Sequence, residues 1–390
     1  MSNQLRGKKI AVMENGLLST YTMREGLMLA LVRQGCEVHI LAHSNSFVSQ
    51  VEKMGLIVHN VGSGNMNPYK VARYIFNVKK ALKIINPDVC LTFSIRPAIF
   101  GNLITRQLKI PTITNITGIG PLFSSKNMVY RTARSMYRNA LSKTKKVFFQ
   151  NADDMNLFLE NNFVNPTVAE TVPGSGVDYD KFKPRVFKEK DHETFVFLFI
   201  GRLIKDKGIF EYFEAAKYIR KKFPHTRFHI IGPFWTQTLR KNTITQSQLQ
   251  NWIDEGIIDY LGEKKDVRNY IAEADCIVLP SYREGTSNIL LEAASMEKPV
   301  VTTNTTGCKE VVEDGVTGLL CRVKDENDLA AKMEMMIMLT KEERNEMGIK
   351  ARQKIIKEYD KQIVVNAYLK AIKEAICQNQ ITVTSPTSHQ

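Results

Sequence analysis

The stretch PSYREGTSNILLE, residues 280–292, is the clearest guide to how this chain folds. The apolar run 274–279 before it predicts a buried strand, and the residues after it predict a helix that continues to about Met296. Gly285 frees the turn between the strand and the helix. The three residues that follow are of types preferred at helix N-caps: Thr286, Ser287 and Asn288.

Two carboxylates flank this junction, Glu284 in the turn and Glu292 eight residues later. Eight residues make about two helical turns, so we expect both side chains on one helix face. Such a junction directs backbone N–H groups and the positive end of the helix dipole at a ligand, commonly a phosphate. The paired acids suit two groups of hydroxyls on one long ligand. A capped surface helix with two solvated acids also explains the stretch when it is taken alone.

The chain of 390 residues is too long for one ordinary core, so we expect two domains. Its 43% hydrophobic and 24% charged residues are typical of a soluble globular protein. No apolar run approaches the ~18–20 residues of a membrane span, and residues 1–9 lack the apolar segment of a signal peptide. The six cysteines form no CxxC or Cys/His cluster, which favours reduced thiols and a cytoplasmic location.

The net charge of +14 belongs entirely to the first half of the chain. Residues 1–190 hold 26 Lys and Arg against 12 Asp and Glu, whereas residues 191–390 hold 28 of each kind. Between residues 89 and 152 there are ten basic residues and no acidic one. We therefore expect the first half to meet an anionic partner: a membrane surface, a diphosphate or a nucleic acid.

Both halves alternate short apolar strands with amphipathic helices, which is the pattern of an α/β protein with parallel sheets. Helices are expected between the strands, for example over 21–33 and 69–84. Strands are expected near residues 9–13, 37–42, 57–60, 89–93, 112–115, 146–149 and 169–172, and then near 195–200, 227–231, 257–260, 276–279, 300–303 and 318–321.

A linker is expected where PGSG, residues 173–176, interrupts this pattern and a charged stretch follows. Two doubly wound domains would leave a cleft at the carboxyl ends of their strands, where such sheets bind ligands. We expect an N-terminal acceptor-binding domain over 1–184, a C-terminal donor-binding domain over 185–360, a helix over 361–378 that packs back on the N-terminal domain, and a disordered tail over 379–390.

A second strand-end loop, GRLIKDKG at residues 201–208, precedes a helix of the second half. Arg202 offers a planar fork for phosphate oxygens, and Lys207 offers a compact charge. Alone, the loop is equally explained as a charged surface turn. Together with residues 280–292, it supplies cations and helix N–H groups for a diphosphate and carboxylates for sugar hydroxyls. The combination predicts a nucleotide-sugar site.

These motifs resemble the retaining GT-B glycosyltransferases of family 4, the glycosyl transferases group 1. The resemblance is strongest over residues 199–208 and 260–320, and the spacing from Glu284 to Glu292 matches the family's E-x7-E signature. One departure is Glu297, because the family usually carries a glycine before Lys-Pro. The resemblance implies two Rossmann-like domains that face a cleft, and transfer of a hexose from a nucleotide-diphosphate sugar, by default UDP-hexose or UDP-N-acetylhexosamine.

By this resemblance, Arg202 and Lys207 hold the donor diphosphate, Glu284 lies near the transferred sugar, and these three are the expected catalytic residues. Glu292 is expected to bind ribose hydroxyls. Breaking the anomeric C–O bond places charge on the leaving diphosphate, which the two cations and the helix start would stabilise. The other expected donor-binding residues are Gly16, Gly201, Gly262, Gly285, Thr286, Ser287 and Asn288.

The segment Asp178-Tyr179-Asp180 is a literal D-x-D, which holds a divalent metal in other glycosyltransferases. Here it lies in the expected linker, shortly before Phe182 and Pro184, and we interpret it as a turn. GT-B enzymes commonly use basic side chains in place of a metal. The resemblance therefore implies neither a metal nor any other cofactor.

The strand ends of the first half carry small and polar residues over 16–24, 94–97 and 114–123. These loops resemble, more loosely, those of family 4 enzymes that extend polyprenyl-diphosphate-linked saccharides for bacterial surface polysaccharides such as capsule or O-antigen. Plain connecting loops are the alternative. The expected acceptor-binding residues are Ser19, Thr20, Arg24, Ser94, Arg96, Asn115, Thr117 and Gly118.

A helix expected over 129–141 places Arg131, Arg134 and Arg138 on one face and apolar residues on the other. We expect the arginines to face an anionic membrane, which gives a cytoplasmic protein held peripherally on the inner face of the plasma membrane. Alternatively, the helix buries its apolar side and exposes the arginines to water.

Three functions are compatible with these observations. The first is a membrane-associated glycosyltransferase. The second is another GT-B enzyme, such as a soluble sugar transferase with a non-lipid acceptor, a phosphorylase or a nucleotide-sugar epimerase. The third is a nucleic-acid-binding protein, which only the pI of about 9.4 suggests. The chain lacks a recognition-helix motif, zinc-ligand spacing and an aromatic RNA-binding signature, so we expect no nucleic-acid partner.

Overall fold

The structure is a computed structural model that describes residues 4–43, 47–62, 67–119, 128–185, 194–234 and 243–384, with only the backbone of 128–130 and 380–384. The chain divides into two compact units. The N-terminal unit comprises Met1–Ser175 and Lys361–Gln390, and the C-terminal unit comprises Gly176–Asp360. The boundary thus falls inside the PGSG segment, nine residues before the boundary expected after residue 184.

The N-terminal unit contains a seven-stranded sheet in the order β3-β2-β1-β4-β5-β6-β7. Every neighbouring pair is parallel, and the order runs outward in both directions from β1 and β4, as in a doubly wound sheet. The strands are β1 (Lys9–Gly16), β2 (Glu37–His43), β3 (Ile57–Asn60), β4 (Val89–Phe93), β5 (Thr112–Ile116), β6 (Lys146–Phe149) and β7 (Ala169–Thr171).

Helices cover both faces of this sheet, which is why its strands are almost continuously apolar. Ile10 and Val12 of β1 pack with one group of helices, and the alternate residues Ala11 and Met13 pack with another. The first face carries α2 (Glu25–Arg33), α3 (Val48–Glu52) and α14 (Lys361–Thr384). The second face carries α4 (Pro68–Ile85) and α5 (Asn102–Gln107). Around β6 lie α6 (Met128–Leu141) and α7 (Ala152–Glu160).

The helix expected over 21–33 is instead two helices, α1 (Leu17–Thr22) and α2. The chain breaks at Arg24, whose backbone leaves the helical region at φ −110° and ψ 1°. Its side chain turns inward and meets the buried carboxylate of Glu14. A tertiary contact therefore overrides the continuous helical pattern of the sequence.

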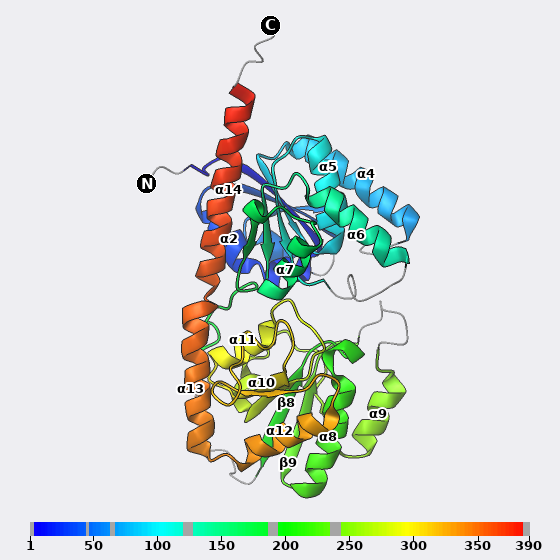
Figure 1. The fold of residues 1–390 in the computed structure, drawn as a ribbon, viewed down its shortest axis with the longest axis vertical. Helices are drawn as coiled ribbons and strands as arrows, with labels where there is room; N and C mark the ends of the chain where they lie inside the picture. Colours follow the sequence, from blue (N-terminus) through cyan, green and yellow to red (C-terminus); the bar gives the residue numbers. More distant parts are fainter. Residues whose placement is uncertain are drawn as a thin grey trace. The chain divides into compact units, whose positions relative to one another are not determined.

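The last helix, α14, packs on the N-terminal unit although it follows the C-terminal unit in sequence. Figure 1 shows it beside α2, at the opposite end of the colour scale. Val365, Tyr368 and Ile372 belong to the same buried cluster as Leu27 and Leu31 of α2. The helix continues to Thr384, so it includes six residues that the sequence assigned to a disordered tail.

The C-terminal unit contains a six-stranded parallel sheet in the order β10-β9-β8-β11-β12-β13. The strands are β8 (Phe195–Ile200), β9 (Thr226–Ile231), β10 (Asp259–Tyr260), β11 (Cys276–Leu279), β12 (Val300–Thr303) and β13 (Leu319–Cys321). The helices are α8 (Ile209–Lys222), α9 (Gln246–Asp254), α10 (Arg268–Glu273), α11 (Asn288–Ser295), α12 (Glu326–Met338) and α13 (Lys341–Glu358). Two parallel α/β sheets confirm the predicted fold class.

None of the helices in the described ranges combines the length and the apolar character that a membrane crossing requires.

Candidate donor site and acceptor edge

Lys207 and Glu284 meet at the carboxyl edge of the C-terminal sheet. Lys207 follows β8, Glu284 follows β11, and these two strands are neighbours. The Lys207 ammonium donates to Glu284 Oε1, and the Ser281 hydroxyl donates to the same oxygen at 2.6 Å. The two side chains are 17% and 13% exposed, so the pair is mostly shielded but reachable from solvent. The sheet order thus joins the two predicted loops into one site.

Two glycines hold these loops against each other. Gly208 has φ +71°, and a Cβ added there would lie 2.1 Å from the carbonyl oxygen of Pro280. Gly307 has φ +83°, and a Cβ there would lie 2.5 Å from the carbonyl oxygen of Glu284. Both positions need glycine for the left-handed backbone and for the close approach. The turn that carries Glu284 is therefore positioned from two sides.

The loop after β12 completes the support of this turn. The Glu284 amide donates to Thr306 O at 3.0 Å, and the Ser287 amide donates to Gly307 O at 3.1 Å. Thr306 and Gly307 were not among the predicted site residues, and neither was Ser281. The signal for Ser281 and Gly307 was their place in runs that resemble the family, but their contacts depend on strands that are distant in sequence.

The N-terminus of α11 lies at this edge. Ser287 occupies the N-cap and makes no side-chain capping hydrogen bond, although the sequence offered three cap-forming residues. By contrast, Asp325 caps α12 and Thr340 caps α13 through their side chains. The first amides of a helix have no acceptor within it, so the start of α11 can donate to an anion.

Glu292 lies in the second turn of α11, whereas Glu284 lies in the loop before it. The expectation that both acids share one helix face is therefore wrong, because the helix starts only at Asn288. Burial raises the pKa of Glu292 to about 8; nearby Lys181 opposes the rise, and Asp266 adds to it. A carboxyl in such an environment is set up to share its proton or accept a hydrogen bond rather than to carry an unpaired charge.

Other predicted donor residues lie in loops along the same edge. Gly201 and the exposed Arg202 directly follow β8, and Gly262, at φ +78°, follows β10. The Gly201 amide donates to Ile231 O, and the Gly232 amide donates to Gly262 O at 3.2 Å. Gly16, by contrast, belongs to the N-terminal unit, where it is the last residue of β1 in an extended conformation. Its donor contact therefore stays a prediction.

The D-x-D segment forms a turn, as the sequence predicted. Asp178 Oδ1 accepts hydrogen bonds from the amides of Asp180 at 3.2 Å and Lys181 at 3.0 Å. That carboxylate oxygen is thus used by its own backbone. Among the described residues, no three His, Cys, Asp or Glu side chains are grouped so that they could hold a metal ion.

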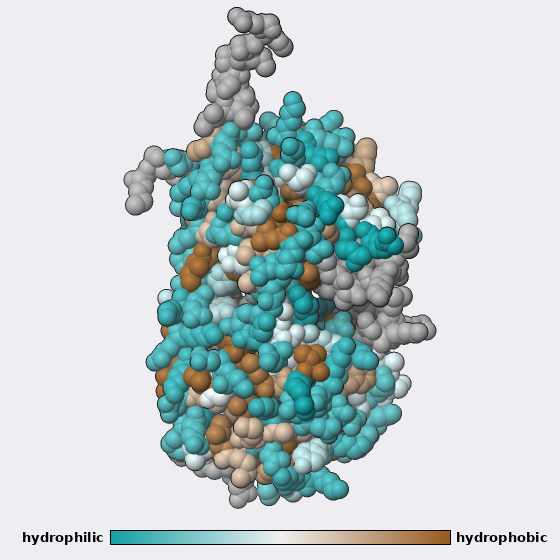
Figure 2. All heavy atoms as spheres, in the orientation of Figure 1, coloured by the Kyte–Doolittle hydropathy of each residue, from teal (hydrophilic) through white to brown (hydrophobic). Residues whose placement is uncertain are grey.

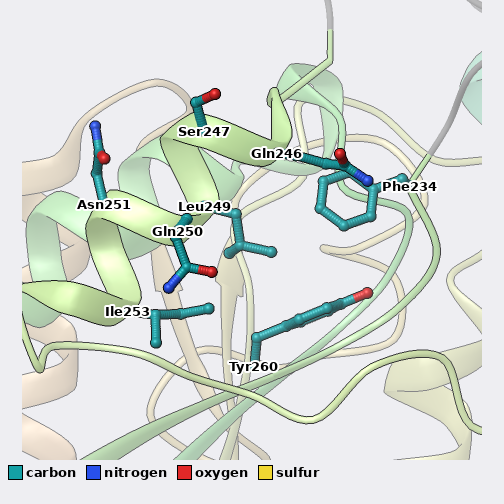
Figure 3. Close-up of a pocket in the computed structure, with 8 residues that line it drawn as sticks. All are labelled: Phe234, Gln246, Ser247, Leu249, Gln250, Asn251, Ile253 and Tyr260. Atoms are coloured by element: carbon teal, nitrogen blue, oxygen red, sulfur yellow. The ribbon is translucent and has the colours of Figure 1, made fainter.

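A hollow of about 590 Å³ lies beside α9, at the ends of β9 and β10 (Figure 3). Phe234 and Tyr260 meet edge to face there, with ring centroids 5.9 Å apart. Leu249, Gln250 and Ile253 point toward Tyr260, whereas Ser247 and Asn251 point away. None of these residues was predicted as part of a site.

The carboxyl edge of the N-terminal sheet contains a buried polar network around Glu14 of β1. Ser19 donates to Glu14 Oε2 at 3.1 Å, and Arg24 Nε lies 3.5 Å from Glu14 Oε1. Arg24 also donates to Ser175 Oγ and lies over the Phe93 ring at 4.5 Å. Burial raises the pKa of Glu14, and Arg24 opposes the rise. Sequence analysis missed Glu14, although an acid at the end of an apolar strand was a visible signal.

The predicted residues at the neighbouring strand ends are less accessible than expected. Asn115 of β5 is buried and donates to the hydroxyl of Tyr368 on α14 at 2.5 Å. Arg96 is buried with its guanidinium 3.9 Å from the centre of the Tyr74 ring. Ser94, at φ +71°, follows β4; Thr117 and Gly118 follow β5. Thr20 Oγ1 and Asn115 Oδ1 are buried and have no hydrogen-bond partner among the described residues.

The three arginines predicted to face a membrane all lie on α6, but they differ in their surroundings. Arg138 donates to Asn161 O at 2.8 Å and lies 5.6 Å from the Phe163 ring, so it is bound to the turn that follows α7. Arg131 is exposed. The face of α6 is therefore only partly directed to solvent.

Comparison with known proteins identifies both halves of the chain. Residues 180–354 match the family described as Glycosyl transferases group 1, and residues 9–151 match the family described as Glycosyl transferase 4-like. The N,N'-diacetylbacillosaminyl-diphospho-undecaprenol alpha-1,3-N-acetylgalactosaminyltransferase of Campylobacter jejuni is 24% identical over 94% of this chain and 99% of its own length. The UDP-Gal:alpha-D-GlcNAc-diphosphoundecaprenol alpha-1,3-galactosyltransferase of Escherichia coli is 26% identical over 75% and 76%.

Solved structures share the whole fold. Anabaena Alr3699/HepE, in complex with UDP and glucose, has a TM-score of 0.77 at 15% identity and covers 94% of this chain and 100% of its own. A glycosyltransferase from Rickettsia africae ESF-5 has a TM-score of 0.75 at 20% identity, with 95% and 99% covered. The predicted family and hexosyltransferase activity are confirmed. This chain is a glycosyltransferase whose C-terminal part matches the group 1 family and whose N-terminal part matches the 4-like family, and it has the GT-B fold of two Rossmann-like domains.

Proposed function

We propose that this glycosyltransferase moves a sugar, with retention of its anomeric configuration, from a UDP-hexose or UDP-N-acetylhexosamine to a polyprenyl-diphosphate-linked saccharide. The proposal of a nucleotide-sugar donor is supported by one observation above all: Lys207, Glu284 and the start of α11 lie together at one sheet edge. Two relatives act on diphospho-undecaprenol saccharides, and one of them is aligned over 94% of this chain. That similarity supports the lipid-linked acceptor.

In the proposed reaction, Arg202, Lys207 and the first amides of α11 stabilise the charge that develops on the leaving diphosphate. Preorganised donors of this kind typically supply several kcal/mol of transition-state stabilisation. Glu284 orients the transferred sugar and keeps Lys207 in place, and Glu292 accepts ribose hydroxyls. These groups supply the positive charge at the diphosphate, so we propose that the reaction needs no metal.

The acceptor is proposed to bind at the carboxyl edge of the N-terminal sheet. Thr20 and Asn115 bring buried, unsatisfied oxygens to this edge, and such atoms normally have a water or ligand partner. The enzyme is proposed to act as a peripheral protein on the cytoplasmic face of the membrane, where polyprenyl-linked acceptors and nucleotide sugars meet.

Transfer of radiolabelled sugar tests this proposal. The purified enzyme is mixed with each of several labelled nucleotide sugars and with a bacterial lipid extract, and label in the organic phase is counted. Label should move to lipid from at least one UDP sugar, and mild acid should release it as a saccharide. Label that moves only to water-soluble acceptors would support the alternative, a soluble GT-B sugar transferase.

A further inference from the structure

The helix α4 exposes apolar side chains that a solvated helix would be expected to bury. Tyr69 is 76% exposed, Phe76 is 67% exposed and Ile84 is 72% exposed. The opposite side of α4 carries Tyr74 and Val78, which are buried against the sheet. The helix is thus held in place by one apolar face and presents a second apolar set outward.

The exposed residues form a single stripe along α4. At 100° per residue, Tyr69, Phe76 and Ile84 fall within an arc of about 100°, which also contains basic residues of the same helix. The stripe consists of Tyr69, Arg73, Phe76, Lys80, Lys83 and Ile84, and we call it the α4 stripe. The helix of 18 residues extends over about 27 Å, so the stripe is long enough to lie along a surface rather than enter a pocket.

The charged residues of α4 and of the two helices beside it have one sign. None of the residues of α4, α5 and α6 is acidic, whereas α4 alone contains Lys70, Arg73, Lys79, Lys80 and Lys83. These helices lie next to one another, α4 against α5 and α5 against α6 (Figure 1). Figure 2 shows apolar side chains among hydrophilic ones where α4 lies in Figure 1.

We infer that the α4 stripe is the surface by which this enzyme docks on an anionic lipid membrane. Aromatic and aliphatic side chains that stand between Lys and Arg are the pattern of a helix that lies in the plane of the interface, with its apolar residues among the acyl chains and its cations at the headgroups. The three helices α4, α5 and α6 contain no acidic residue, and a surface of this kind fits a continuous negative surface better than a protein partner of mixed charge. The inference deepens the proposed function and rests on it for the lipid-linked acceptor.

This assignment moves the membrane contact from α6 to α4. In α6, Arg138 is already bound to Asn161 and Phe163, and α6 offers no exposed aromatic residue among its described side chains. The arginines of α6 then add to the positive electrostatic potential of α4 and α5, while the apolar side chains of α4 insert into the membrane.

Co-sedimentation of the full-length protein with vesicles tests the inference. Phosphatidylglycerol–phosphatidylethanolamine vesicles are compared with phosphatidylcholine vesicles, at low and high salt. We expect binding only to the anionic vesicles. Tyr69→Ser/Phe76→Ser/Ile84→Ser should lower the partition coefficient at least about tenfold at all salt concentrations. Arg73→Glu/Lys80→Glu should lower it at least as much and reduce its salt dependence, because two cations attracted to the anionic headgroups are replaced by two repelled carboxylates.

Helix α13 provides matched controls, because it exposes Ile349 and Ile356 among charges of both signs. Ile349→Ser/Ile356→Ser and Lys350→Glu/Lys357→Glu should leave vesicle binding unchanged. Equal losses with α13 and α4 variants, or a loss with Arg131→Glu/Arg134→Glu but not with α4 variants, would overturn the inference. Binding of the wild-type protein to vesicles of pure phosphatidylcholine would also overturn the inference. The same holds if the wild-type protein self-associates without lipid and the α4 substitutions abolish that self-association.

Transfer to a short-chain, water-soluble diphosphate acceptor separates the two proposals. The α4 variants should keep this activity at the wild-type rate and lose transfer to polyprenyl acceptors embedded in vesicles. If wild-type protein binds anionic vesicles through α4 but transfers sugar to neither acceptor, the docking surface stands and the proposed function fails.

Discussion

Lys207 and Glu284 are 77 residues apart in sequence and form an ion pair at the edge of one sheet. Their strands, β8 and β11, are neighbours because the chain crosses the sheet between them. The pair joins a cation suited to phosphate to a carboxylate suited to sugar hydroxyls. This relationship underlies the donor site and gives the first prediction.

Lys207→Ala and Glu284→Ala should each lower kcat/KM more than tenfold, a loss of over ~1.4 kcal/mol in transition-state stabilisation. Circular dichroism should be unchanged, and stability should fall by less than about 2 kcal/mol because the pair lies at a partly solvated edge. Lys217→Ala is the matched control, since Lys217 lies on α8 of the same unit and forms an exposed pair with Glu255 at the end of α9. A folded Lys207→Ala or Glu284→Ala enzyme with more than a tenth of wild-type turnover would refute the assignment.

Gly208→Ala should unfold or strongly destabilise the C-terminal unit, whereas Gly256→Ala should not. Both glycines have φ +71°, but a Cβ at Gly208 meets the Pro280 carbonyl at 2.1 Å and a Cβ at Gly256 meets nothing within 4 Å. Gly256→Ala should therefore cost only the backbone strain, roughly 1 kcal/mol. Urea unfolding should show a clearly larger loss for Gly208→Ala; equal losses would mean that the loop at Pro280 moves freely.

Glu292→Gln should stabilise the donor-free enzyme at alkaline pH. The folded state keeps the Glu292 proton up to about pH 8, whereas the unfolded chain releases it near the ordinary pKa of 4.5. Wild-type stability should therefore fall as the pH rises from about 4.5 to 8, by at most about 1.4 kcal/mol for each unit of pKa shift.

Thermal unfolding at pH 5, 7 and 9 checks this expectation. The advantage of Glu292→Gln over wild type should be small at pH 5 and largest at pH 9. Glu342→Gln, a substitution of an exposed acid on α13, serves as the control. A difference between wild type and Glu292→Gln that is independent of pH would show that burial does not hold the proton.

Glu297→Gly should be more stable than Glu297→Ala by about 1 kcal/mol. Glu297 follows the C-cap of α11 with φ +58°, a left-handed conformation that favours glycine. This is the position where the sequence departs from the family pattern. Both substitutions remove the pair with Arg352 at 3.8 Å, so the difference between them reports the backbone alone. Equal urea midpoints would contradict the strain.

Chelation of metal ions should leave the transfer rate unchanged. Lys207, Arg202 and the start of α11 are proposed to balance the diphosphate charge, and Asp178 is engaged in a turn. The measurement is the initial rate with excess EDTA, and then with added Mg²⁺ or Mn²⁺. Loss of activity with EDTA and its restoration by metal would contradict the proposal, and Asp178→Ala would then show whether the D-x-D segment is responsible.

Local patterns were sufficient for most elements of the fold. Apolar strands such as 195–200 and 276–279 were predicted at the bounds the structure has, because burial on both faces makes each strand a continuous apolar run. The junction 280–292 was also predicted as a strand, turn and helix. The start of α11 agrees with this prediction, because its N-cap Ser287 is one of the three residues predicted as caps. Only the shared helix face of Glu284 and Glu292 failed, since the amides of Glu284 and Ser287 are bonded to the loop at 306–307 and Glu284 stays outside the helix.

Distant contacts explain where the sequence interpretation failed. The division of helix 21–33 follows from Arg24 meeting Glu14, and no periodicity in the helix itself signals that partner. Arg96 was expected at an open strand end but is buried against Tyr74, and its contact with an acceptor stays a prediction. The exposed side chains of α4 could not be told from core residues, because Tyr69, Phe76 and Ile84 are as apolar as the residues that α4 buries.

The sequence by itself determined the class of fold, the order of strands and helices, the basic character of the first half and the residue types at the donor site. These follow from local composition and spacing, which act within about ten residues. Only the tertiary structure decided that Lys207 pairs with Glu284, that Arg24 turns inward to Glu14, and which face of α4 remains open. Those outcomes depend on which strands become neighbours, and the free energy that selects neighbours comes from burial summed over the whole sheet.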